Sequence, residues 1–434
     1  MTTPGLIIRH GSTLKFPFVG ALSLAMLIPL TMVRSVVVER HGMQSTAARV
    51  IASRWGGPQT VGGLVALREA EAMSAGPRVV RRQKEWRART PSELAIEVQL
   101  TTEERYLGIY RVPVYAGMLT IRGKLGAELL DPEKSPGALT FWLPLSDVRG
   151  LREISALNIG SLAIPARPLA TRPAQLSGVQ FTISAADRQA LKGQEFVDYR
   201  IDLTLAGSGS LCFLPLAETS RISLVSDWPH PEFVGQFLPV EHKIGTDSVQ
   251  ASWRLLGLNR TFGEEWALDD LPFEKLAATG FGMRLDTPVD IYQRSERSVK
   301  YGSLFIALTF VTLFLFEITG GKSLHPVPYM LTGAALAVFY LVLLALSEHL
   351  SFAAAFALAA ALLAGIVGPY TGALLGARSG VLAALMMLVT YTLLYLLVSA
   401  QHLSLLLGSL SLLLAIALLM YLTRGVDWYG HGSA

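Results

Sequence analysis

A short run with two prolines brings together residue types that could bind a metal or move a proton. The run "DWPHPEFVGQFLP", residues 227–239, holds His230 between two prolines and places Glu232 close to it. Imidazole and carboxylate groups are common ligands of zinc. Glu241 and His242 follow, and they could complete a four-ligand site. The order His-x-Glu and then Glu-His lacks the spacing typical of zinc motifs, so we expect no metal site, no cofactor and no catalytic residue.

The same run can instead form a stiff corner that serves only the fold. A residue that precedes proline avoids the α region, so Trp228 and His230 are both expected to be extended. Trp228 and Phe233 would then act as apolar anchors of the corner. We favour this interpretation over a partner-binding surface, and we take Trp228, His230, Glu232 and Phe233 as candidate structural or interaction residues.

Two more titratable residues lie in the short segment "LSEHLSF", 346–352. Glu348 and His349 interrupt a long apolar stretch, and we expect them at the outer surface of a membrane. They could dock an external domain, remain solvated or respond to pH through the imidazole. The sequence leaves these three roles open.

A third group of charged residues lies just after the first apolar segment and just before the second. The segments 38–55 and 288–302 are expected to lie next to each other, because both join the same external domain to the membrane. Ion pairs between them would couple the two segments, and Glu39, Arg40 and Arg297 are the main candidates. The remaining charged residues nearby are Arg34, Arg294, Glu296 and Lys300.

Long apolar segments at both ends of the chain must position these residues. The protein has 434 residues, of which 51% are hydrophobic and 16% charged, a balance typical of membrane proteins. Between 301 and 422, only Glu317, Lys322, Glu348 and Arg378 are acidic or basic, and they fall near breaks between spans of bilayer length. We expect six transmembrane helices, at 16–37, 302–319, 327–346, 351–369, 380–398 and 402–422.

The short loops between these helices predict an orientation. Lysine and arginine occur at both termini and in the loops 320–326 and 370–379, but not in the loops 347–350 and 399–401. Positive residues accumulate on the cytoplasmic side, so both termini are expected in the cytoplasm of a bacterial inner membrane. The expected organisation is a cytoplasmic 1–15, a span at 16–37, a periplasmic domain at 38–300, a five-helix bundle at 301–422 and a cytoplasmic 423–434.

The first span is expected to remain in the protein as an anchor. It is longer than the apolar core of a signal peptide, and "MVRSVVVER" lacks a cleavage signature of small residues. Pro29 is expected to kink it. After the span, apolar residues recur at helical spacing as far as Trp55, which predicts an amphipathic stem that ends at Gly56.

The external segment has the pattern of a β-rich domain. Runs such as "ELAIEVQLT", "FVDYRIDLTLAG" and "RISLVS" alternate apolar and polar residues with period two. Many short strands without long helices between them predict an antiparallel, sandwich-like fold, so the chain is expected to be an α+β membrane protein. Acidic and basic residues are nearly balanced here, which argues against a nucleic-acid partner. The single cysteine, Cys212, cannot form an internal disulfide.

The fourth apolar helix carries a row of small residues. Ala353, Ala357, Ala361 and Gly365 repeat every four residues on one face, a spacing that lets two helices approach closely. We favour contact within the same chain and keep a homo-oligomer as the alternative.

Four stretches resemble the CreD family of bacterial inner-membrane proteins, also called cell envelope integrity proteins. They begin with "LIPLTMVRSVVVERHG", "CFLPLAETSRISLVSDWPHP", "FGMRLDTPVDIYQRSERS" and "LHPVPYMLTGAALAVFY", at 27, 212, 281 and 324. The resemblance implies a large periplasmic domain and a role in envelope integrity and stress tolerance. It implies no reaction, no cofactor and no catalytic residue.

The function that we expect is therefore non-enzymatic. The periplasmic domain would act by interaction, with membrane lipids and with an envelope protein as partners. The alternative is a transporter or lipid-handling protein whose external domain receives cargo for the helix bundle. Carriers usually place ionisable residues within their spans, and here only Glu317 lies arguably inside one.

Overall fold

The computed structural model describes residues 18, 20–75, 80–131, 138–169, 176–191, 194–285, 291–320 and 324–400, and scattered positions between 406 and 420. The chain divides into two compact units. Residues 1–43 and 289–434 form a helical unit, and residues 44–288 form a β-rich unit.

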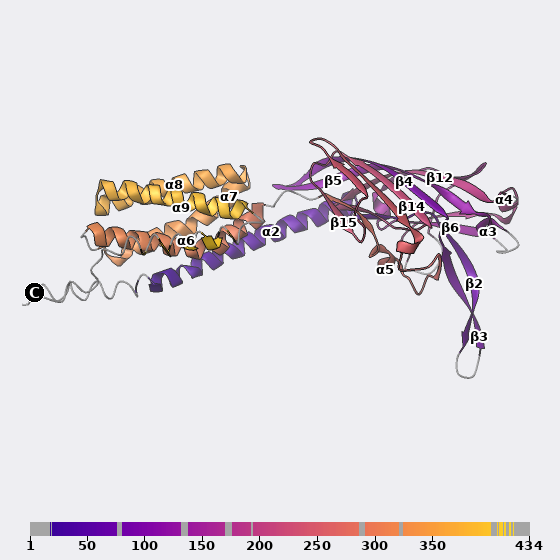
Figure 1. Ribbon diagram of the computed structural model, residues 1–434, viewed down its shortest axis with the longest axis horizontal. Coiled ribbons are helices and arrows are strands. Elements are labelled where there is room, and N and C mark those ends of the chain that lie inside the picture. Colours follow the sequence, from indigo (N-terminus) through magenta and orange to yellow (C-terminus); the bar gives the residue numbers. More distant parts are fainter. Residues whose placement is uncertain are drawn as a thin grey trace, which may run out of the picture. The chain divides into compact units, whose positions relative to one another are not determined.

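Five helices in the described part of the chain are long and apolar enough to cross a membrane. Figure 1 labels them α2 (Leu27–Trp55), α6 (Ile291–Gly320), α7 (Pro326–Ser347), α8 (Phe352–Leu375) and α9 (Ala377–Ser399). They correspond to the first five helices predicted from the apolar pattern. The last predicted span, 402–422, lies mostly outside the described residues. Helix α6 begins before the expected residue 302, so residues 291–300 are helical and extend the apolar span by a polar segment.

Helix α2 contributes residues to both units, because it continues as the predicted stem to Trp55. The helical pattern is interrupted at Met26, three residues before Pro29, which cannot donate a backbone hydrogen bond. At the other end, Gly56 has a φ of +139° and lies against the Ala206 carbonyl, where an added Cβ would be 2.5 Å from the oxygen. A glycine is therefore required where the stem ends.

The row of small residues on α8 does not pack against helices of the described chain. Ala353, Ala357, Ala361 and Gly365 are all exposed, and a Cβ added to Gly365 would meet nothing within 4 Å. The expected same-chain contact is therefore not seen among the described helices, and the last predicted span lies mostly outside them. Both faces of α8 are apolar, so helical periodicity identified residues on one face without deciding which face is buried.

Close approach occurs instead between α8 and α9, at glycines further along α8. A Cβ on Gly380 would lie 2.6 Å from the Cα of Gly372 and 2.7 Å from the Gly368 oxygen. Small residues at this crossing let the two backbones touch, which maximises van der Waals contact in a setting where lipid offers no hydrophobic driving force.

The β-rich unit contains three sheets. The nine-stranded sheet has the order β16 (Glu241–Ile244), β17 (Val249–Leu256), β14 (Thr219–Ser226), β4 (Glu93–Leu107), β5 (Tyr110–Gly126), β12 (Phe196–Ser208), β8 (Leu157–Ile159) and β9 (Leu162–Ile164), with β7 (Leu151–Ile154) also paired to β12. The six-stranded sheet has the order β10 (Arg167–Pro168), β11 (Gly178–Ile183), β6 (Leu139–Pro144), β2 (Val65–Ala75), β3 (Val80–Arg89) and β18 (Glu265–Ala267). The four-stranded sheet has the order β1 (Gln59–Val61), β13 (Ser210–Phe213), β19 (Phe281–Leu285) and β15 (Pro231–Gly235). Short helical segments are α3 (Ala127–Leu130), η1 (Val148–Gly150), α4 (Ala185–Gln189), η2 (Gly257–Asn259) and α5 (Phe273–Ala277).

One face of the nine-stranded sheet is covered by the two smaller sheets. A single core cluster includes Ile121 of β5, Phe141 of β6 and Phe281 of β19, one residue from each sheet. Burial alternates along the strands, as in "eBiBeBeB" at the start of β4, because successive side chains point to opposite faces. The sandwich-like arrangement and the strands predicted from period-two runs agree with the sequence analysis.

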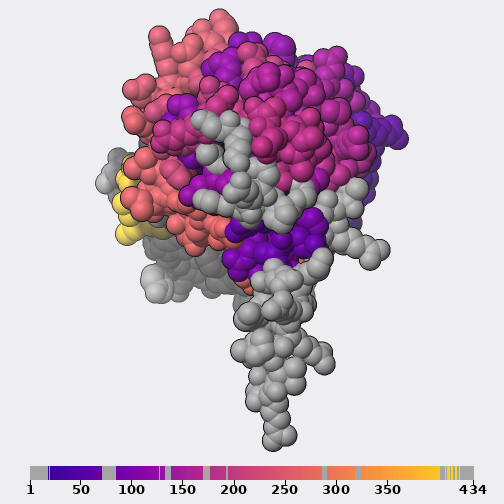
Figure 2. Space-filling view, turned by 90° about the vertical axis from the view of Figure 1, so that its right-hand side faces the viewer, coloured from indigo at the N-terminus to yellow at the C-terminus, as the bar shows by residue number. Residues whose placement is uncertain are grey.

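The sheets are not wholly antiparallel. Strand β14 runs parallel to β4, and β1 runs parallel to β13. Parallel neighbours need crossover connections, and the segment between β4 and β14 contains the strands β5 to β13. Figure 2 faces this unit, and its surface is built from violet, magenta and salmon residues that are distant in sequence.

Candidate functional site

The run 227–239 forms a corner between two sheets. It begins where β14 ends at Ser226 and continues into β15, which pairs with β19. The Asp227 carboxylate accepts hydrogen bonds from the Thr102 backbone N–H at 2.9 Å and from its hydroxyl at 2.8 Å. Trp228 is only 8% exposed, and its indole N–H donates to the His230 carbonyl at 3.0 Å. The geometry supports the interpretation as a rigid corner.

The polar side chains of this run do not converge on one point. His230 is exposed, and Glu232 pairs with Arg284 of the neighbouring strand at 2.9 Å. Glu241 and His242 belong to β16 of another sheet. Among the residues that the structure describes, no group of three or more His, Cys, Asp or Glu side chains could hold a metal ion.

The aromatic residues of the corner pack inward. Phe233 lies 5.8 Å from the Trp253 ring and 5.5 Å from the His242 ring, measured between centroids. Phe237 lies 5.7 Å from Phe281. These contacts join the corner to the main core, so Trp228 and Phe233 offer little surface to a partner.

A second set of candidate residues forms a polar cluster within the helical unit. Glu348, just after α7, accepts a hydrogen bond from the Tyr292 hydroxyl of α6 at 3.2 Å, and Arg40 of α2 lies 3.9 Å away. The Glu348 side chain is 9% exposed, which excludes the solvated role considered above. Glu348 therefore links three helices at one end of the bundle. His349 is exposed.

The expected ion pairs between α2 and the start of α6 are realised by Arg34 and Glu296, 3.1 Å apart. The side chains of Glu39 and Arg297 have no hydrogen-bond or ion-pair partner among the described residues. Both Arg34 and Glu296 are largely solvent-exposed, so this pair contributes little free energy by itself.

The Glu317 carboxylate is buried and accepts a hydrogen bond from the Tyr329 hydroxyl at 2.8 Å. Two cavities in the described helices, beside Thr309 and beside Tyr329, have volumes of about 10 Å³ each. That is room for about one water molecule. Neither cavity is of substrate size.

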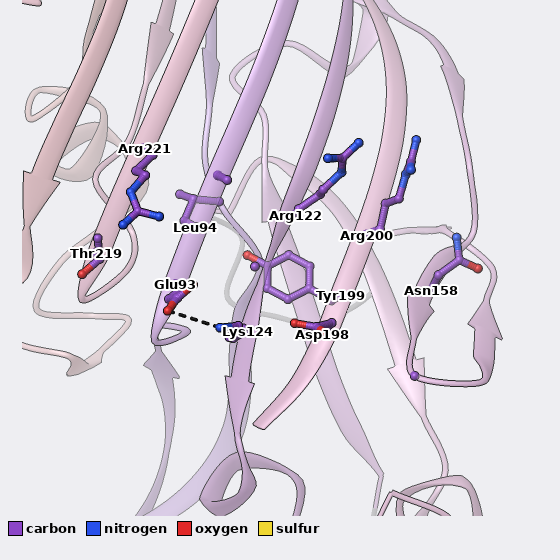
Figure 3. Close-up of a pocket in the computed structure, with 13 residues that line it drawn as sticks. Glu93, Leu94, Arg122, Lys124, Asn158, Asp198, Tyr199, Arg200, Thr219 and Arg221 are labelled. Atoms are coloured by element: carbon purple, nitrogen blue, oxygen red, sulfur yellow. Dashed lines mark ion pairs between the residues drawn. The ribbon is translucent and has the colours of Figure 1, made fainter. Parts of the chain in front are cut away.

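A wide hollow lies on the outer face of the nine-stranded sheet and was not anticipated from the sequence. It has a volume of about 500 Å³ and is open to solvent (Figure 3). The side chains that line it come from β4, β5, β8, β12 and β14. They belong to Glu93, Leu94, Ala95, Arg122, Lys124, Asn158, Asp198, Tyr199, Arg200, Thr219 and Arg221.

Three of the lining arginines belong to one row across the sheet. The register pairs Arg200 with Arg122, Arg122 with Ala95, and Ala95 with Arg221. Arg221 in turn pairs with Arg254 on β17. We call Arg200, Arg122, Arg221 and Arg254 the arginine row. Each arginine stands on the solvent face of its strand, and no spacing along the chain signals that they meet.

The charges beside the row are partly compensated. Arg200 donates to both Asp202 oxygens, at 2.8 and 3.0 Å, and this contact holds the pKa of the Asp202 carboxyl below its usual range. Arg122 lies 3.4 Å from Glu97, and Lys124 lies 3.5 Å from Glu93.

Comparison with known proteins identifies the family. The model of the family described as "Inner membrane protein CreD" matches residues 12–429. The Inner membrane protein CreD of Escherichia coli (strain K12) is 32% identical over 421 residues, which cover 94% of this chain and 91% of that protein. A match of this length includes both units and the helix that they share. The chain belongs to the CreD family of inner membrane proteins.

Proposed function

We propose that this protein is a non-enzymatic component of the bacterial inner membrane that supports envelope integrity and stress tolerance. In this proposal both termini are cytoplasmic, a sixth helix follows α9, and the β-rich unit lies in the periplasm and acts by interaction. The family membership and the distribution of lysine and arginine in the short loops support this placement.

The observation that carries the proposal is the continuity of α2. One helix begins in the apolar span and ends at Trp55, inside the β-rich unit. The ring of Trp55 lies between two guanidinium groups, with the Arg105 Cζ at 4.2 Å and the Arg152 Cζ at 4.9 Å from its centroid. A partner bound to the β-rich unit would therefore act on residues that continue the chain of a membrane helix.

The experiment is photo-crosslinking in living cells, combined with deletion of the gene. Crosslinking residues are placed at Leu238 and Val240, which are 72% and 70% exposed beside the edge strand β16. The buried Trp228 serves as the control position. We expect a defined envelope protein or lipid adduct from the exposed positions, and increased sensitivity of the deletion strain to detergent. Normal detergent tolerance of that strain would contradict the proposed role.

The alternative of a transporter or lipid-handling protein needs a passage or a groove for cargo. The buried pair of Glu317 and Tyr329 is the feature that such a mechanism would use. The two water-sized cavities give this alternative less support than the interaction role.

A further inference from the structure

The arginine row carries more positive charge than its surroundings neutralise. Among the described residues, the side chains of Arg221 and Arg254 have no hydrogen-bond or ion-pair partner, and the two residues are directly opposite each other on neighbouring strands. Like charges at such positions destabilise a sheet. Arg122 and Arg200 form a second like-charged pair, compensated by Glu97 and Asp202. An anion that bound here would relieve the repulsion.

Ala95 makes space in the middle of the row. Its strand, β4, lies between the strands of Arg122 and Arg221, so two guanidinium groups flank a side chain of one carbon. Neighbouring strands are about 4.8 Å apart, which puts the Cα atoms of the two arginines about 10 Å apart. A phosphate fits between them, and guanidinium groups bind phosphate through paired hydrogen bonds.

The hollow extends beyond the room that one phosphate needs, and its other end has different chemistry. Glu93, Lys124, Asp198, Asn158 and Thr219 line the part next to the row, and Glu93 is ion-paired with Lys124, as Figure 3 shows. Carboxylate and amide oxygens accept hydrogen bonds from hydroxyl or amino groups, and carboxylates repel a second anion. The ligand that matches the hollow therefore has one anionic end and one end rich in hydroxyl or amino groups.

We propose that this hollow binds a phosphorylated sugar, with the phosphate between Arg122 and Arg221 above Ala95. The sugar hydroxyl or amino groups face Glu93, Asp198 and Asn158. The same chemistry occurs in soluble sugar phosphates and in the head groups of phosphorylated glycolipids. This binding site would give the proposed function a ligand. It rests on that function only for the expectation that the ligand comes from the cell envelope.

The test is calorimetric binding to the full chain in detergent micelles. The probes are glucosamine 1-phosphate, inorganic phosphate and unphosphorylated glucosamine, and vesicles that contain a diphosphorylated glucosamine lipid. We expect glucosamine 1-phosphate to bind more tightly than either fragment, with an affinity that falls as salt is raised. Binding to the vesicles alone would assign the site to the glycolipid form, and binding to the soluble probe as well would assign it to the sugar phosphate itself.

Two variants and a matched control make the test specific. Arg122→Gln combined with Arg221→Gln is expected to weaken binding at least about ten-fold, the effect of losing hydrogen bonds to a charged group. Ala95→Phe fills the hollow without changing its charge and is expected to abolish binding. Arg254→Gln removes an arginine of the same row outside the hollow and is expected to change affinity less than about three-fold.

Equal affinity for inorganic phosphate and glucosamine 1-phosphate would overturn the assignment of a sugar, and so would unchanged binding by Ala95→Phe. Absence of binding to every probe would overturn the site. The detergent sensitivity of the deletion strain does not depend on this hollow, so a failure of the site and a failure of the proposed function are separate results.

Discussion

Trp55, the last residue of α2, anchors that helix in the β-rich unit. Its indole N–H donates to the Tyr115 carbonyl at 3.2 Å, and its own carbonyl accepts from Arg152 at 2.9 Å. Together with the two guanidinium groups on its ring, these contacts hold α2 at the point where it ends.

The substitution Trp55→Ala is expected to lower the free energy of unfolding of the β-rich unit by about 2 kcal/mol, because packing and cation–π contacts are both lost. The measurement is urea denaturation of the full chain in detergent. The control is Trp55→Phe, which keeps an aromatic ring beside the two arginines. It is expected to lower the free energy of unfolding by about half as much as Trp55→Ala. An unchanged unfolding midpoint for Trp55→Ala would contradict the anchoring role.

Asp147 stabilises the same junction from the other side. Its carboxylate accepts hydrogen bonds from the Arg149 side chain at 2.8 Å and from the Gly57 N–H at 3.1 Å. The Arg149 contact, together with the backbone N–H groups, holds the pKa of Asp147 below its ordinary value of 3.8 despite partial burial. A depressed pKa means that the contact stabilises the fold above the unfolded pKa, and that the stabilisation is lost as pH falls through the folded pKa.

Asp147→Asn is therefore expected to cost about 1–2 kcal/mol of unfolding free energy at neutral pH. The difference from the natural protein should narrow between about pH 5 and pH 2, as the natural carboxylate becomes protonated. Denaturation of both proteins across this range is the measurement. A difference that stays constant with pH would exclude the charged hydrogen bonds as its cause.

At the scale of elements, the packing of α8 on α9 depends on glycines, which have no side chain to keep the two helices apart. Gly368 and Gly372 of α8 face Gly380 of α9, and their backbones are in contact. The exposed Gly365 on the same helix has open space around it and offers a matched comparison.

Gly380→Val is expected to separate the two helices and to destabilise the helical unit by about 1–3 kcal/mol, the usual cost of overpacking. Gly365→Val adds the same side chain at an exposed position and is expected to have a small effect. Thermal unfolding of both variants in detergent would measure the loss of stability that each substitution causes. Equal losses for the two variants would argue against the close crossing.

Prediction from sequence succeeded for elements whose pattern is periodic. The period-two runs at 93–101, 196–207 and 221–226 became β4, β12 and β14, and the first five apolar segments became long helices. The region 146–195 was poorly patterned, and it contains strands of two to six residues, η1 and α4. Strands this short have too few alternating positions to produce a recognisable period.

At the scale of the whole molecule, the orientation in the membrane is the main prediction. In a protein with Cys212→Ala, a single cysteine replaces either Asp247 of the β-rich unit or Arg378 at the start of α9. A maleimide reagent that cannot cross the inner membrane is expected to label Asp247→Cys in intact cells, because positive loops mark the cytoplasmic side. Arg378→Cys should react only after the membrane is opened. The reverse pattern would invert the proposed topology.

The sequence by itself determined where apolar and alternating segments lie, and hence that helices of membrane length flank a β-rich unit. Hydrophobic length and period are local properties of the chain, so no partner segment is needed to recognise them. The spacing around His230 also argued against a zinc motif, because ligand spacing is a local property as well.

Only the tertiary structure decided which residues meet. The arginine row combines Arg122, Arg200, Arg221 and Arg254 from four strands, and it exists because β14 lies parallel to β4 in the middle of the sheet. Strand order and register depend on the burial of one shared core, which no short stretch of sequence contains. For the same reason, the exposed face of α8 and the buried Glu348 became apparent only when the helices were packed together.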